Sequence, residues 1–282
     1  MDFQTPAHGA ACIYACTSTT DPASERLAAS SLPSYSKSKV IPYPLHTSDE
    51  QSTLALIDDV LNAWGRLDVW VCSSGLLGPP SIDLTTPSDL QKCFEANSLG
   101  PFFALKYAPP AMEKLCSKGN YPNASEKDRG YGSIIVVNSV ASTYGGCWGP
   151  CYTMCSHAAL GVVRSGVSVL KGSKHAYFLL YMDNNRLPGT KVRINCVSPG
   201  QIDIGVSLKD FDMRGMQSQL PPSSLQSVDK QKDRIGLERA GSPTEVARVA
   251  GFLASGFSSY ITGANMVVDG GASVMCPLIA PV

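Results

Sequence analysis

The sequence predicts an α/β fold in which one parallel β-sheet is covered by helices on both faces, a doubly wound arrangement of three layers. Short runs that are apolar throughout alternate with longer segments whose apolar residues recur at helical spacing. Continuous apolar runs are typical of strands buried on both faces, and strands that alternate with helices are typical of parallel sheets. No repeat or linker interrupts this pattern, so we expect a single domain over residues 1–282.

The elements follow one another along the chain. Strands are expected at 11–16, 67–75, 132–140, 191–200 and 264–271, and helices at 49–65, 86–116, 152–170 and 244–255. Gly65 stops the first of these helices, because glycine readily adopts the left-handed conformation that follows a helix end. The second helix is long, and we expect it either to bend near Pro101 or to end at Pro109 and Pro110.

Composition excludes several functional classes. Lys+Arg and Asp+Glu both number 23, so the zero net charge gives no reason to expect nucleic acid or an anionic membrane as a partner. No apolar run reaches the roughly 18 residues of a membrane-spanning helix, so none is expected. The beginning of the chain lacks the basic region of a secretory signal, which favours the cytoplasm and reduced thiols.

The ten cysteines are interpreted as apolar packing residues rather than as metal ligands. Cys147, Cys151 and Cys155 follow one another at intervals of four, so two of them would share a helix face. The paired C-x2-C spacing of common zinc sites is not found. We therefore expect no metal.

Several short motifs stand in a fixed order. They are LDVWVCSSG at 67–75, Asn97 within FEANSLGPF, Ser139 thirteen residues before Tyr152, SPGQID from 198, and GLERAGSPTEVARVAGFLASGFSSYITGANMVVDGG before residue 272. In this order, from about Gly9 to Gly271, the chain resembles the short-chain dehydrogenase/reductase family. The resemblance implies a Rossmann-like fold.

The resemblance also implies a reaction. The family moves a hydride between a nicotinamide ring and a carbonyl or alcohol carbon, while a tyrosine exchanges a proton with the substrate oxygen. An unperturbed phenol has a pKa of about 10, so the family uses a lysine one helical turn later to favour phenolate. Tyr152, Ser139 and Asn97 match the family's catalytic positions, but Ser156 stands where the lysine belongs. A serine can bond a ribose hydroxyl but carries no charge, so retained hydride transfer stays an open question.

The family's cofactor motif is only partly present. Its first strand, glycine-rich turn and helix, which hold the dinucleotide pyrophosphate, have no counterpart in the residues MDFQTPAH before Gly9. We expect unpaired strand edges inside the sheet and weakened or lost binding of NADP or NAD. In the family an acidic residue at the end of this strand binds the ribose of NAD, so its lack after 11–16 slightly favours NADP over NAD as the cofactor. The resemblance places the other cofactor contacts at Thr17, His46, Thr47, Ser73, Gly75, Asn97, Tyr152, Pro199, Gly200 and Ile202.

Residues 173–189 lengthen the interval between Tyr152 and Pro199. Without SKHAYFLLYMDNNRLPG the sequence reads as a direct join from helix to strand. Seventeen codons equal 51 bases, so an unspliced intron of fungal type is one interpretation. The other is a genuine loop beside the cofactor cleft.

The leading hypothesis is an oxidoreductase that acts on a carbonyl or secondary alcohol of an apolar metabolite, in fungal secondary metabolism. Apolar residues within 205–236, a flap over the substrate in the family, suggest the apolar substrate. By resemblance, the protein is expected to form a homo-oligomer, a dimer or tetramer. Two alternatives remain: a non-redox catalyst that uses Tyr152 and Ser139, and an inactive binding or scaffold subunit.

Overall fold

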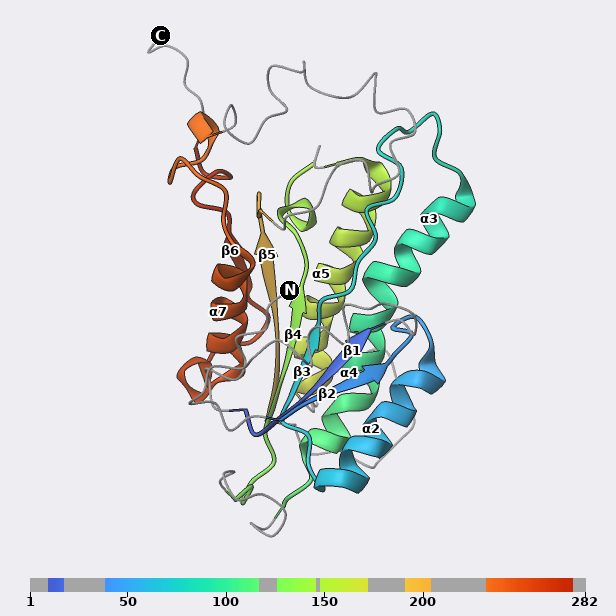
Figure 1. Cartoon of the computed structure of the whole chain (residues 1–282), viewed down its shortest axis with the longest axis vertical. Coiled ribbons are helices and arrows are strands. Elements are labelled where there is room, and N and C mark those ends of the chain that lie inside the picture. Colours follow the sequence, from blue (N-terminus) through green and yellow to red (C-terminus); the bar gives the residue numbers. More distant parts are fainter. Residues whose placement is uncertain are drawn as a thin grey trace.

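The structure is a computed structural model that describes residues 10–17, 39–116, 126–145, 148–171, 191–203 and 232–275. The larger sheet has four parallel strands in the order β3 (Val69–Cys72), β4 (Gly132–Val137), β5 (Val192–Pro199) and β6 (Asn265–Val268). Its helices are α2 (Glu50–Trp64), α3 (Pro87–Phe94), α4 (Gly100–Met112), α5 (Pro150–Leu170) and α7 (Pro243–Ala254). The helices α2 to α5 lie on one side of this sheet and α7 lies on the other (Figure 1). This arrangement confirms the predicted doubly wound α/β fold.

Alternate residues of the central strands build two separate cores. Ile134 and Val136 of β4 belong to the core beneath α4 and α5, whereas Ile135 packs into the core beneath α7. In β5, Ile194 faces the first core and Val197 faces the second. Successive side chains of a strand point to opposite faces, so a strand that is apolar at every position needs a helical layer on both sides.

The helix expected at 86–116 is interrupted in its middle. A π-helical turn at Glu95–Leu99 separates α3 from α4 and contains Asn97. The helix then continues through Pro109 and Pro110 to Met112. The expected end at the proline pair is therefore wrong, and the break lies just before Pro101. Single π turns inside α-helices often occur at functional sites.

The caps of α2 agree with the sequence. The Asp49 side chain accepts a hydrogen bond from the Ser52 N–H at the first turn. Gly65 has a φ of 71° and its N–H returns to the Leu61 carbonyl, which ends the helix where it was expected to end.

A strand that the sequence pattern did not predict lies at β2 (Lys39–Pro44). It pairs in parallel with β1 (Cys12–Thr17), and these two strands form a sheet of their own. Pro42 and Pro44 kept this strand from being predicted, because proline cannot donate to a sheet ladder and is confined to edge strands. Among the described residues β2 pairs only with β1, and an edge strand tolerates both prolines.

Among the described residues, the strands form two sheets that separate between β1 and β3. No strand among the described residues pairs with the second edge of either β1 or β3. The residues of both strands are half-buried, whereas the first five residues of β4 are fully buried. Residues 173–189 and most of 205–236 lie outside the described residues.

Candidate functional site

A pocket of about 410 Å³ lies where strands β1, β2 and β3 end. Its walls include Thr17, Leu45, His46, Thr47, Ser48, Ser74, Gly75, Leu76, Lys92, Glu95 and Ala96. Ligands of open parallel sheets bind outside the carboxyl ends of the strands. The structure therefore gathers four of the residues that the sequence assigned to the cofactor, which are Thr17, His46, Thr47 and Gly75. Ser74 borders the pocket in place of the expected Ser73.

Asn97 holds the loop that follows β3. Its Nδ2 donates to the carbonyls of Leu76 at 2.8 Å and Cys93 at 2.7 Å, and its Oδ1 accepts from the Leu76 N–H at 3.3 Å. A Cβ on Gly75 would lie only 2.8 Å from that oxygen. The Asn97 side chain is thus engaged with backbone, and its position requires glycine at 75.

Ser139 lies just past β4 and caps a short 3₁₀ turn at Val140–Ser142. Its Oγ accepts a hydrogen bond from the Ala141 N–H at 3.1 Å. A serine hydroxyl that accepts one bond still carries a proton to donate. Ser139 can therefore act as a donor to a substrate oxygen.

The beginning of α5, which carries Tyr152 in its first turn, is fixed against the loop after β3. Trp148 has a positive φ of 66°, and its Nε1 donates to the Gly78 carbonyl at 2.9 Å. A Cβ on Gly149 would lie 2.6 to 2.9 Å from the backbone of Pro80. A bulky residue at positive φ is a strained position, and such strain clusters at functional sites.

Ser156 lies one helical turn after Tyr152 and is fully buried. Its carbonyl accepts from Asn138 Nδ2 at 2.8 Å, but its Oγ has no hydrogen-bond partner among the described residues. The expected contact between this hydroxyl and a cofactor ribose is therefore not available in this structure. The short side chain ends inside the protein, where a lysine would have extended further.

Pro199, Gly200 and Ile202 lie at the end of β5, away from the residues that line the pocket. The Gly200 N–H bonds the Val268 carbonyl, and a Cβ at Gly200 would meet Asp269 at 2.5 Å. Ile202 pairs with Gly241 in an isolated bridge. These residues lie at the carboxyl end of β5, which pairs with β6 at the other side of the sheet from β3.

Sequence reasoning missed Lys92 and Glu95, which line the pocket, and Asn138 and Trp148, which fix α5. Lys92 and Glu95 are three residues apart, so a helical projection would have placed these two on the same face. The contacts of Asn138 and Trp148 join segments far apart in the sequence. No local pattern indicates them.

The residues present fit one part of a nicotinamide dinucleotide. The small side chains at Ser74 and Gly75, together with His46 and Lys92, suit the adenosine end. The described residues provide no glycine-rich turn at a helix N-terminus beside this pocket for the pyrophosphate. The described residues also hold no group of three His, Cys, Asp or Glu placed for a metal ion, and no described helix is long and apolar enough to cross a membrane.

Two family descriptions match successive parts of the chain. Residues 6–172 match the family described as short chain dehydrogenase, and residues 184–273 match the one described as enoyl-(acyl carrier protein) reductase. The 3-oxoacyl-[acyl-carrier-protein] reductase of Thermotoga maritima is 27% identical over 233 residues, 83% of this chain and 77% of that protein. (+)-Borneol dehydrogenase 2 of Salvia officinalis is 28% identical over 224 residues, 79% of this chain and 68% of that protein.

A solved structure shares the fold. The crystal structure of levodione reductase superimposes with a TM-score of 0.62 at 21% identity, and the match covers 85% of this chain and 79% of that one.

Proposed function

Because this chain belongs to the short-chain dehydrogenase/reductase family of oxidoreductases, we propose that it reduces a carbonyl on an apolar metabolite with NADP as the preferred cofactor. The observation that carries the proposal is the hydrogen bond from Asn138 to Ser156, which joins the end of β4, next to Ser139, to the turn of α5 that follows Tyr152. Borneol dehydrogenase and zerumbone synthase of Zingiber zerumbet, both named for apolar products or substrates, are among its relatives.

A nicotinamide dinucleotide, whose adenosine end His46, Gly75 and Lys92 would hold, would provide hydride chemistry at the substrate carbon. The residues of this chain supply the proton that converts the substrate oxygen into an alcohol. We propose that the Tyr152 O–H delivers the proton and that the Ser139 O–H donates a hydrogen bond to the same oxygen, so that the developing negative charge is stabilised as the proton arrives. Asn97 positions Gly75 and Leu76, which line the pocket.

The neutral side chain at 156 favours one direction of reaction. A cation there would stabilise the phenolate, which is needed to remove a proton from an alcohol. Ser156 carries no charge and is buried, so the phenol is better suited to donating a proton than to accepting one. We therefore propose carbonyl reduction rather than alcohol oxidation.

The cofactor preference rests on two features of the pocket. Lys92 lines it, and Glu95, which lies on the π turn, is the one acid among the described residues that line it. A lysine near the adenosine end favours a phosphate-bearing ribose. Without a described pyrophosphate cradle, we expect weak binding.

The split sheet favours a second candidate, a subunit that uses no dinucleotide. No strand among the described residues pairs with the second edge of β1 or of β3, and these edges border the place where the family holds its cofactor. In this case, Tyr152 and Ser139 serve as acid and hydrogen-bond donor in a non-redox step, or the chain is an inactive binding or scaffold subunit.

Titration separates these functions. NADPH and NADH are titrated by fluorescence, and reduction of a panel of apolar cyclic ketones is followed by consumption of the reduced cofactor. The proposal expects turnover with NADPH and its loss in Tyr152→Phe, with an unchanged circular dichroism spectrum. Turnover without any cofactor supports the non-redox catalyst, and turnover that survives in Tyr152→Phe contradicts the assigned role.

Oligomeric state, location and metabolic setting complete the proposal. As in the family generally, we propose a homo-oligomer, a dimer or tetramer, in the cytoplasm, with a fungal secondary metabolite as the substrate class. Light scattering of the purified protein measures the mass of the assembly and tests the first of these.

A further inference from the structure

Three buried cysteines lie together between α3 and α5. Cys93 of α3 is 0% exposed, and Cys151 and Cys155 of α5 are each 1% exposed. They form a cluster of their own, with Leu90 packed against it. Cys151 and Cys155 are one helical turn apart, so both face α3. The proposed reaction uses none of these thiols.

Two of the three cysteines behave as a pair. Cys93 and Cys155 belong to the same buried cluster, and the interaction between their thiols raises the pKa of Cys93 and lowers the pKa of Cys155. The Cys151 thiol has a different partner, the Thr85 side chain, and burial raises its pKa. The interaction between Cys93 and Cys155 therefore distinguishes one pair within the cluster.

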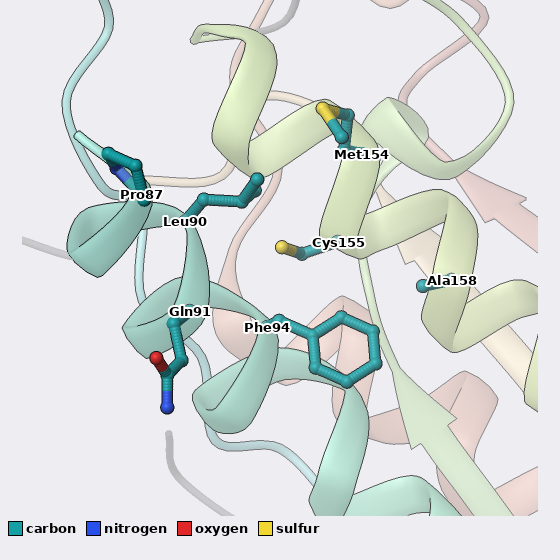
Figure 2. Close-up of a pocket in the computed structure, with 7 residues that line it drawn as sticks. All are labelled: Pro87, Leu90, Gln91, Phe94, Met154, Cys155 and Ala158. Carbon is teal, nitrogen blue, oxygen red and sulfur yellow. The ribbon is translucent and has the colours of Figure 1, made fainter. Parts of the chain in front are cut away.

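Cys155 is the member of this pair that borders a pocket. Its sulfur points into an apolar pocket of about 440 Å³ between α3 and α5, bordered by Leu90, Phe94 and Met154 (Figure 2). The Cys93 sulfur instead faces backbone, with the Leu76 carbonyl 3.2 Å away and Asn97 Nδ2 at 3.3 Å. An attacking thiolate with access and a resolving thiol behind it are the two parts that a redox-sensitive pair requires.

We propose that Cys155 and Cys93 form a reversible disulfide in response to a hydroperoxide. The Cys155 thiolate attacks one peroxide oxygen, the O–O bond breaks, and the products are a sulfenic acid at Cys155 and hydroxide or an alkoxide. The Cys93 thiol then attacks the Cys155 sulfur, the S–O bond breaks, and the Cys93 proton leaves with the hydroxyl as water. Two thiols are oxidised and one peroxide is reduced.

The disulfide would connect two segments that carry the proposed active site. Cys93 lies four residues before Asn97, and its sulfur accepts a hydrogen bond from the Asn97 side chain. Cys155 lies between Tyr152 and Ser156 on α5. Oxidation therefore fixes α3 against the turn of α5 that carries both residues, whether or not the chain binds a dinucleotide.

Peptide mapping of the whole protein tests the proposal. The reduced protein is treated with hydrogen peroxide, free thiols are alkylated, and chymotrypsin digestion is followed by mass spectrometry without reduction. Chymotrypsin cleaves after aromatic residues, and Tyr152 lies between Cys151 and Cys155, so the two candidate partners fall on different peptides. We expect a peptide that links Cys93 to Cys155 and disappears on reduction.

Two variants sharpen the result. Cys151→Ser is the matched control and keeps the disulfide, whereas Cys155→Ser loses it and leaves Cys93 alkylated. The map of the unaltered protein decides the question even if a variant fails to fold. A link from Cys93 to Cys151, or alkylation of both Cys93 and Cys155 after peroxide treatment, overturns the proposal.

Discussion

The side-chain Nδ2 of Asn138 donates a hydrogen bond to the main-chain carbonyl of Ser156 across 2.8 Å. Asn138 directly follows β4, and Ser156 lies in the second turn of α5. This single contact joins the strand end next to Ser139 to the helix that carries Tyr152. It requires a side-chain hydrogen-bond donor at 138, because the acceptor is a carbonyl.

Replacing Asn138 by leucine removes this bond without changing the side-chain volume greatly. We expect the free energy of unfolding to fall by about 1 kcal/mol, because the Ser156 carbonyl loses the hydrogen bond from this side chain. Urea denaturation measures the change. Asn62→Leu, at an exposed position of α2, is the control and stays within about 0.5 kcal/mol. An equal effect of the two substitutions would argue against the anchoring role.

Ser156→Ala should stabilise the protein. The buried Oγ has no partner among the described residues, so the variant removes an unsatisfied polar atom and gains helix propensity. The expected gain is about 1 kcal/mol, measured by urea denaturation. A loss of similar size would mean that the hydroxyl has a partner, such as an ordered water.

Ser156→Lys tests the missing charge. If Tyr152 exchanges the proton, an ammonium one turn away favours phenolate and moves the pH–rate profile for alcohol oxidation to lower pH. Moving the profile by a single pH unit corresponds to about 1.4 kcal/mol of stabilisation of the phenolate. Position 156 is fully buried, so circular dichroism must first show that the variant folds. An unchanged profile in a folded variant means that charge at 156 does not limit the reaction.

Alanine substitutions at two glycines of the α5 segment should change the stability of the protein in opposite directions. Gly149→Ala places a Cβ within 2.9 Å of the Pro80 backbone, so we expect a loss of stability. Overpacking of this kind costs about 1–3 kcal/mol. Gly161→Ala has no neighbouring atom within 4 Å, and alanine in a helix interior gains about 0.5–1 kcal/mol over glycine. Thermal denaturation compares them, and changes of the same sign would contradict the position of α5.

Glu245 should make the free energy of unfolding depend on pH in the acid range. The hydrogen bonds from Arg239, at 2.7 and 2.9 Å, and from the Ser242 N–H lower the pKa of this carboxyl from 4.5 to about 2. A depressed folded-state pKa contributes stability above the unfolded value, and this contribution is lost as the pH falls from 4.5 towards 2.

The measurement is the slope of unfolding free energy against pH in that window. Glu245→Gln should flatten it, while Glu113→Gln, at an exposed position after α4, should leave it unchanged. Identical slopes for the native protein and Glu245→Gln would show that the carboxylate is not held in this way.

The sequence alone determined whether most segments form a strand or a helix, through the spacing of their apolar residues, and it determined the order of the motifs. Gly65, the apolar runs at β4 and β5, and the interval from Ser139 to Tyr152 are local features, and local features set strand, helix and family. Residues 39–44 escaped prediction because their prolines mask a strand that only pairing with β1 stabilises.

Only the tertiary structure decided which groups meet. The pocket draws Thr17 from the end of β1 and His46 and Gly75 from the segments after β2 and β3. The Asn97 side chain, on the π turn, bonds a loop about twenty residues away. The burial of Ser156 and the interaction of Cys93 with Cys155 likewise depend on how α5 packs against β4 and α3. Such contacts are set by packing between segments distant in the sequence, and no periodicity within a single segment encodes them.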